Sequence, residues 1–305
     1  MCLYSLHRKL CGNFKHKIFF FAKLIKISRI VRDKPKHLSR TRRINLKIAR
    51  YEAHGQIHYG AIEGDEVKEL TASPFDDFSV SDHTHKLSDV KLLAPCEPGK
   101  ILAIGLNYSS HLHDRPAPPE PMVFIKTQTS LIGPGDTIIR PKQEDLVVGD
   151  EASGKFDAEA ELVIVIKDTC KNVSKEDALN HVFGYTCGND VSARDWQRND
   201  RNWWRAKSSD TFSPCGPWIE TDLDPGNVRV TGRINGKEVQ SETTSYLIFD
   251  VPTIISFITK FMTLEPGDLI YTGTPGEPQQ MFDGDVCEIE IEGIGTLSNP
   301  IKLTS

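Results

Sequence analysis

Hydrophobic and polar positions along the chain predict several strands and two helices. The segments "ELVIVI" (161–166) and "DLIYTGTP" (268–275) are continuous apolar runs, typical of buried strands. The segment "GDVCEIEIEGIGTL" (284–297) alternates, as a half-exposed strand does. We predict two helices. One follows Ser174 over "KEDALNHVF", and one follows Asp250 over "VPTIISFITKFM", each with a capping signal at its start.

Turn residues divide residues 43–305 into two predicted domains. Residues 43–95 contain "NLKIARYEAHGQIHYGAIEGDEVKEL", which predicts short strands around Gly-centred turns and hence a small N-terminal domain. The polar stretch "SPFDDFSVSDHTHKLSD" (73–89) is predicted to be a connection. Pro95, Pro98 and Gly99 mark a boundary. Residues 96–305 would form the second, mixed domain.

Charge sets residues 1–42 apart as a basic extension. The first 50 residues hold 15 Lys and Arg against one acid, and the remainder has a net charge of −19. This acidic body argues against nucleic-acid binding. No apolar run is long enough for a membrane span. The extension has the composition of a mitochondrial presequence, but a disordered tail or an upstream reading-frame artefact remains open, so the expected location is cytoplasmic or mitochondrial.

Three acidic residues, Asp157, Glu159 and Glu161, stand where an apolar strand begins. Alternate residues of a strand share a face, so Glu159 and Glu161 would lie side by side. Their repulsion can be relieved by a cation, a shared proton or solvent exposure. Asp190, in "GYTCGNDVSARDWQ", would add a third carboxylate from another element. Such an all-oxygen site suits Mg²⁺, Mn²⁺ or Ca²⁺.

Six segments in order carry a resemblance to the fumarylacetoacetate hydrolase family: "GLNYSSHLHD", "FDAEAELVIVI", "GYTCGNDVSARDWQ", "RAKSSDTFSPCGP", "NGKEVQSETTSYLIF" and "LEPGDLIYTGTP". The resemblance covers about residues 45–305. It implies a mixed β-rich (α+β) fold, with a β-sandwich or roll in the C-terminal domain, flanking helices and a small N-terminal domain. It also implies a homodimer.

The resemblance assigns metal and catalytic roles to particular residues. Mg²⁺ or Mn²⁺ would be bound by Glu159, Glu161 and Asp190. His111 would activate water with Asp114, which stands where the family more often has Glu; His113 is a competitor for this role. Arg194 and Asp195 would form an ion pair or support the ligands.

Further residues match the family's substrate contacts. Lys207 would stabilise a developing negative charge on the substrate, and a solvated surface lysine is the alternative. Gln197 and Thr274 would contact substrate. Lys126 matches a lysine near the site and is expected to be structural or peripheral.

The resemblance implies a divalent-metal-dependent hydrolase that cleaves a C–C bond in a 2,4-dioxo acid. Alternatives within the family are an oxaloacetate-type decarboxylase and a 2-hydroxy-diene-dioate isomerase, and a non-catalytic metabolite-binding protein is a third. A serine hydrolase lacks its GxSxG motif here, and nucleotide binding lacks GxGxxG.

Overall fold

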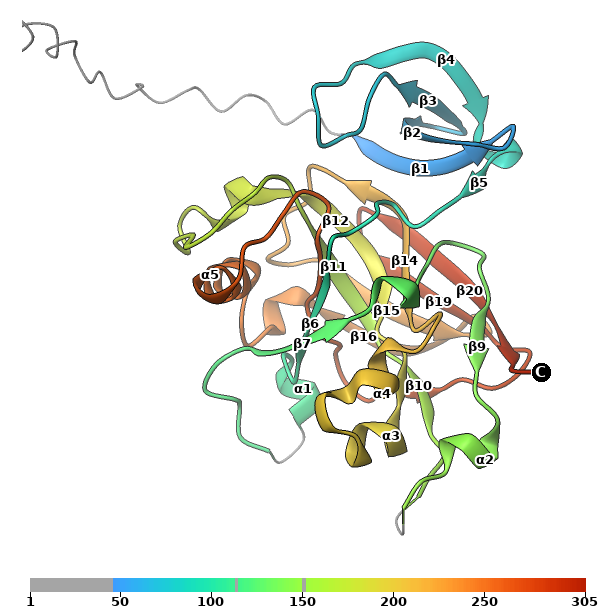
Figure 1. Ribbon diagram of the computed structural model, residues 1–305, viewed down its shortest axis with the longest axis vertical. Helices are drawn as coiled ribbons and strands as arrows, with labels where there is room; N and C mark the ends of the chain where they lie inside the picture. Colours follow the sequence, from blue (N-terminus) through green and yellow to red (C-terminus); the bar gives the residue numbers. More distant parts are fainter. Residues whose placement is uncertain (1–45, 113–114, 150–151) are drawn as a thin grey trace, which may run out of the picture. The chain divides into compact units, whose positions relative to one another are not determined.

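Three β-sheets organise the part of the chain that the computed structural model describes, residues 46–112, 115–149 and 152–305. The largest has the strand order β4-β3-β2-β1-β14-β12-β11-β17-β6-β7, with β5 beside β1 and β8 beside β14 (Figure 1). The other two have the orders β16-β15-β19-β20-β9 and β13-β10-β18. The β-rich fold class predicted from the sequence is confirmed.

The strands have these bounds: β1 Lys47–Ala53, β2 Gln56–Glu63, β3 Glu66–Leu70, β4 Val80–Lys86, β5 Lys91–Leu92, β6 Ile101–Gly105, β7 Met122–Lys126, β8 Leu131–Ile132, β9 Ile138–Arg140, β10 Phe156–Ala158, β11 Ala160–Ile166, β12 Val182–Asn189, β13 Ser192–Ala193, β14 Ser213–Glu220, β15 Arg229–Ile234, β16 Lys237–Thr243, β17 Leu269–Tyr271, β18 Gln279–Gln280, β19 Val286–Ile291 and β20 Gly295–Leu303. The α-helices are α1 Ser109–Leu112, α2 Gln143–Leu146, α3 Arg194–Asn199, α4 Trp204–Ser208 and α5 Val251–Phe261. Short 3₁₀ helices are η1 Leu87–Asp89, η2 Gln128–Ser130, η3 Ala178–His181, η4 Arg201–Trp203 and η5 Thr244–Tyr246.

Strand β11 is buried on both faces, because a different hydrophobic core covers each face. Leu162 and Ile164 belong to one core, which includes residues of β15, β19 and α5. Val163 and Val165 belong to the other, which includes residues of β1 and β17. Successive side chains of a strand point to opposite faces, so both sets must be apolar. This confirms the prediction of a buried strand over 161–166.

The N-terminal strands continue the largest sheet, since β1 pairs with β14 through Ile48 and Ile219. The prediction that 73–89 is a connection is wrong. Val80–Lys86 forms β4, the end strand of the sheet, antiparallel to β3. Every residue of β4 is exposed or half-buried. An end strand can be held by backbone pairing with polar side chains on both faces, so it lacks the apolar alternation that reveals other strands.

The two helix predictions have different outcomes. Helix α5 is confirmed, and Asp250 caps it by accepting a hydrogen bond from the backbone N–H of Thr253 at 2.9 Å. Ile254, Ile255 and Ile258 of this helix are buried, whereas Phe261 is 71% exposed. The helix expected after Ser174 is wrong. Only the 3₁₀ turn η3 forms, because β12 begins at the next residue, Val182.

No helix among the described residues is both long enough and apolar enough to cross a membrane.

Asn107 ties the end of β6 to two distant segments of the chain. Its Nδ2 donates to the carbonyl oxygens of Thr272 at 2.7 Å and Phe249 at 3.1 Å, and its Oδ1 accepts from the Phe249 N–H at 2.8 Å. The side chain is fully buried. Asn107 therefore fixes the backbone between β6 and α1 against the segment that follows β17.

Replacing Asn107 with Ala should lower the free energy of unfolding by about 2–4 kcal/mol, because several buried backbone groups lose their partners. Urea denaturation measures the change. The control is Ser88→Ala, which removes an exposed hydrogen bond to Asp89 and should change stability by less than about 0.5 kcal/mol. Equal stability of the two variants would contradict this role of Asn107.

Candidate active site

Three buried carboxylates meet where β10 ends and β11 begins. Glu159 lies between the two strands, β10 pairing with β13 and β18 while β11 pairs with β12. The expectation that Glu159 and Glu161 belong to one continuous strand is therefore wrong. Glu159, Glu161 and Asp190 nevertheless each offer an oxygen within 4.8 Å of the others, and each is at most 4% exposed. These three residues are called the acidic cluster below.

Two buried lysines contact the acidic cluster. The Nζ of Lys207 donates to Glu159 Oε2 at 2.5 Å and to Asp190 Oδ2 at 2.6 Å. The Nζ of Lys126 donates to Asp190 Oδ1 at 2.5 Å and to the backbone oxygen of Lys207. Lys207 is therefore not a solvated surface residue, and Lys126 is fully buried against Asp190. Burial alone would lower the pKa of Lys207, but Asp190 and Glu159 outweigh it and raise that pKa.

Arg194 connects the acidic cluster to Asp157, the remaining acidic residue of the segment "FDAEAELVIVI". Its Nη2 donates to Glu159 Oε1 at 2.6 Å and its Nε to Asp157 Oδ2 at 2.7 Å. Burial would raise the pKa of Glu159, but Arg194 and Lys207 hold it below its usual range. Arg194 thus supports Glu159, as expected. It does not pair with Asp195, which instead accepts hydrogen bonds from the backbone N–H groups of residues 153 and 154.

Glu161 differs from the other two carboxylates of the acidic cluster, because no cationic side chain among the described residues pairs with it. Its Oε2 accepts a hydrogen bond from the Gly273 N–H at 2.7 Å. Burial, reinforced by the charges of Asp190 and Glu159, raises its pKa well above the usual value. Four carboxylates here face three cationic side chains, so one further positive charge fits. The all-oxygen donor set matches a hard divalent cation.

A cavity opens beside the acidic cluster, and His111 lies in its wall. The ring Nδ1 lies 2.7 Å from the backbone oxygen of Gly276. A carbonyl only accepts, so Nδ1 carries the proton and Nε2 is the basic nitrogen of the neutral ring. Burial lowers the pKa of His111, which favours this neutral form.

The other predicted site residues divide into two groups. Gln197 and Thr274 line the same cavity as His111. Gln197 accepts from Arg194 at 2.9 Å, and the hydroxyl of Thr274 lies 2.9 Å from Gln240 Nε2. His113 and Asp114 lie outside the described residues, so the pairing of His111 with Asp114 stays a prediction.

Sequence reasoning missed several residues that line this cavity, among them Arg115, Met122, Phe124 and Trp203. Arg115 directly follows the "HLHD" motif, and this position was the available signal. The ammonium of Lys207 lies 5.4 Å from the centre of the Phe124 ring, and the rings of Phe124 and Trp203 are in edge contact. These contacts join β7 to the segment before α4, and no local pattern encodes them.

Comparison with known proteins assigns the chain to a family. The model for the fumarylacetoacetate (FAA) hydrolase C-terminal domain matches residues 100–302, and the Rv2993c-like, N-terminal model matches residues 46–95. The chain belongs to the fumarylacetoacetate hydrolase family. Among its relatives is the mitochondrial oxaloacetate tautomerase fahd2 of Xenopus laevis, 41% identical over 72% of this chain and 70% of that protein.

Solved structures in this family share the fold. A 2-hydroxyhepta-2,4-diene-1,7-dioate isomerase from Mycobacterium marinum is 39% identical, with a TM-score of 0.77 over 85% of this chain and 99% of that one. A maleylpyruvate hydrolase from Sphingobium, in complex with manganese(II) ion and pyruvate, is 28% identical, with a TM-score of 0.68 over 85% of this chain and all of that one. Family members thus include a tautomerase, an isomerase and a hydrolase.

Replacing Arg194 with Ala should lower the free energy of unfolding by about 3–5 kcal/mol, because two buried carboxylates lose their partner. Chemical denaturation measures the loss. The control is Arg229→Ala, which removes an exposed arginine whose side chain donates one hydrogen bond to Ser241 and should cost less than about 1 kcal/mol. A similar loss in both variants would show that the carboxylates do not depend on Arg194.

Proposed function

We propose that the protein transfers a proton at the carbon next to the keto group of a short 2-oxo diacid, interconverting its keto and enol forms. The observation that carries this proposal is the position of one imidazole, that of His111, in the same cavity wall as the acidic cluster and Lys207. The relatives named as an oxaloacetate tautomerase and a diene-dioate isomerase, 41% and 39% identical, support this type of reaction.

His111 would act as the base in this reaction. Its Nε2 takes the proton from the carbon beside the keto group, the C–H electron pair forms the C=C bond, and the C=O π electrons move to the keto oxygen. This oxygen then takes a proton from the protonated ring and becomes the enol hydroxyl, which leaves His111 neutral again. The hydrogen bond from Nδ1 to Gly276 holds the ring in the tautomer that this step needs.

The remaining groups of the cavity would position the substrate. The ammonium of Lys207 stabilises negative charge on a substrate oxygen next to the acidic cluster. Arg115 offers a further cation in the cavity wall besides Lys207 and Arg194, suited to the distal carboxylate of a diacid. A divalent Mg²⁺ or Mn²⁺ ion held by Glu159, Glu161 and Asp190 would supply Lewis-acid polarisation of the substrate carbonyl.

Hydrolytic cleavage of a 2,4-dioxo acid, the reaction expected from the sequence, is the second candidate. The same His111 Nε2 can take a proton from water instead of carbon. The maleylpyruvate hydrolase structure, 28% identical, favours this reading. Decarboxylation of oxaloacetate is the other alternative. It involves no attacking water, so it would not need His111 to activate one.

Oxaloacetate and acetylpyruvate assays with Mn²⁺ distinguish these reactions. We expect faster loss of the enol absorbance of oxaloacetate than in buffer, with oxaloacetate itself conserved. The acceleration should fall by at least about 100-fold in His111→Ala and in Glu161→Gln, the scale of a general base. Glu52→Gln, at an exposed position on β1, is the control.

Other outcomes of these assays replace the proposal. Release of pyruvate and acetate from acetylpyruvate in equal amounts would establish the hydrolase. Pyruvate and CO₂ from oxaloacetate would establish the decarboxylase. No turnover of either substrate by a folded, metal-loaded protein would contradict an enzyme acting on these acids and favour a metabolite-binding protein.

The pH profile tests the role of His111 separately. Because burial lowers the pKa of this ring, it stays neutral and basic to a lower pH than an ordinary histidine. We expect kcat/KM to remain level as the pH falls through about 6.5, the usual histidine value, and to decline only below it. Residual activity of His111→Ala should lack this decline. A decline centred above 6.5 in the wild type would contradict the assignment.

Three further expectations from the sequence stay predictions. They are the division of the chain into residues 1–42, 43–95 and 96–305, the homodimer, and a cytoplasmic or mitochondrial location. The Xenopus relative is named as mitochondrial, and the basic residues 1–42 lie outside the described part of this chain.

A further inference from the structure

A second group of potential metal ligands lies on the N-terminal strands, in the stretch whose strand the sequence did not reveal. His83 and His85 are two residues apart on β4, so both side chains project from the same face. Strand β3 lies beside β4, with Val67 opposite His85. The register of β3 against β4 shifts at Glu69, but on its other side Glu69 pairs with Gly60 of β2, two residues from His58, and so shares the face of His58.

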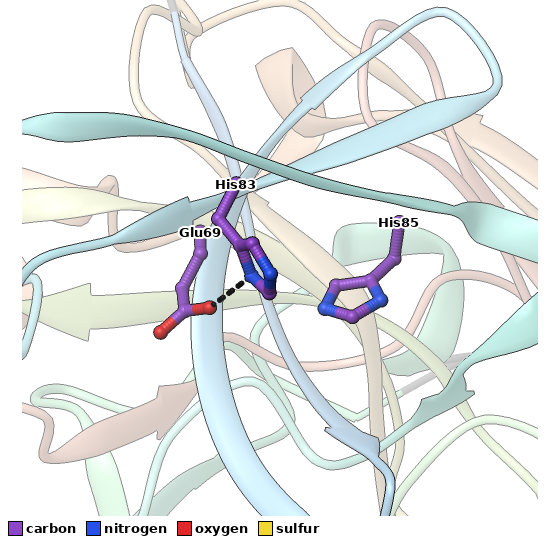
Figure 2. A group of neighbouring side chains, drawn as sticks. All are labelled: Glu69, His83 and His85. Atoms are coloured by element: carbon purple, nitrogen blue, oxygen red, sulfur yellow. Dashed lines mark hydrogen bonds and ion pairs between the residues drawn. The ribbon is translucent and has the colours of Figure 1, made fainter.

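The Glu69 carboxylate connects histidines from two strands. Its Oε2 lies 3.0 Å from Nδ1 of His83 on β4, and its Oε1 lies 3.1 Å from Nδ1 of His58 on β2. The rings of His83 and His85 are 5.2 Å apart, and Figure 2 shows the ring of His83 between the Glu69 carboxylate and the ring of His85. The side chains thus converge from three adjacent strands of one sheet.

The buried ring of Tyr51 packs against two of these histidine rings. Tyr51, fully buried on β1, stacks on His58 at 5.6 Å and contacts His85 edge-on at 5.8 Å. Its hydroxyl finds no hydrogen-bond partner among the described residues. Gly60 on β2 allows β3 to pack closely here, because a Cβ at this position would come within 2.4 Å of a Val67 methyl carbon. The inner side of the histidine and glutamate group therefore packs against side chains of the same sheet.

The same group is open to solvent on its outer side. The side chain of His83 is 70% exposed, whereas those of Glu69 and His58 are 27% and 20% exposed. One ligand can therefore rotate without disturbing the core, while the others are held by packing. An ion from solution can reach this group, and water can complete its coordination.

We propose that Glu69, His83 and His85, the histidine cluster, bind a divalent transition-metal ion of the zinc type. Each residue offers one ligand atom, and these atoms lie within 4.8 Å of one another. Zinc binds imidazole nitrogen and carboxylate oxygen at about 2.0–2.2 Å, so a small rotation of the exposed His83 brings the three atoms onto one ion. Two imidazoles and one carboxylate are a zinc-type donor set, unlike the all-oxygen acidic cluster.

Bound metal would fasten the end strand of the largest sheet. His83 and His85 belong to β4, which pairs with β3 alone among the described strands, while Glu69 belongs to β3. The ion would cross-link the two strands through their side chains. Because the ligands come together only in the folded chain, zinc should stabilise the folded state.

Zinc titration of the full-length protein tests the site. Calorimetry with Zn²⁺ would compare the wild type with the double variant His83→Ala/His85→Ala and with His181→Ala. The control removes a histidine on η3 that pairs with Asp168, outside the histidine cluster. A change in Zn²⁺ binding that occurs in the double variant but not in His181→Ala is therefore caused by loss of the histidine cluster.

We expect the double variant to bind one Zn²⁺ fewer per chain than the wild type and the control. Zinc should also raise the melting temperature of the wild type more than that of the double variant. His83→Ala alone changes an exposed residue, so it should keep the fold, checked by circular dichroism, and weaken this binding at least about tenfold. Zinc binding of equal number and affinity in the wild type and His83→Ala would overturn the proposal and leave a hydrogen-bonded surface group.

Discussion

An unbalanced buried charge is the constraint on which the architecture of the active site depends. Four carboxylates, nearly inaccessible to water, face three cationic side chains, and Glu161 is left without a cationic partner among the described residues. Burying an unpaired carboxylate costs several kcal/mol, on the order of the total stability of a domain. The arrangement is therefore stable only if Glu161 takes up a proton or a further cation binds. The same incomplete neutralisation makes the site able to bind a metal ion and polarise a substrate.

The scaffold supports this charge through elements that are distant in sequence. Strand β11 is anchored by a core on each face, so the residues at its start are held rigidly. The break before Ala160 directs Glu159 toward Arg194 and Lys207, while Glu161 is held by the backbone of Gly273. His111 lies in the wall of the same cavity, where burial favours its neutral form. A set of paired charges and one base thus share a cavity.

Local signals made part of this structure predictable. The buried run of β11 and the cap of α5 at Asp250 depend on neighbouring residues, and both were found. Motifs in a family-like order selected the acidic residues and His111, and the structure places them around one cavity, while their roles stay predictions. The ion pair of Lys126 with Asp190 was not predicted, because the two residues are 64 positions apart in the sequence. The histidine cluster was missed for a related reason: His83 meets Glu69 only through the pairing of β3 with β4, and β4 has no apolar alternation.

Titration of the metal-free protein with Mn²⁺ tests the central claim most directly. Wild type, Glu161→Gln and the exposed-site control Glu52→Gln would be compared by calorimetry and by the electron paramagnetic resonance signal of free Mn²⁺. The charge imbalance predicts one Mn²⁺ per chain that is lost in Glu161→Gln and retained in Glu52→Gln, with no loss of folded structure. Unchanged Mn²⁺ binding by Glu161→Gln would contradict the claim that the uncompensated charge of Glu161 creates the metal site.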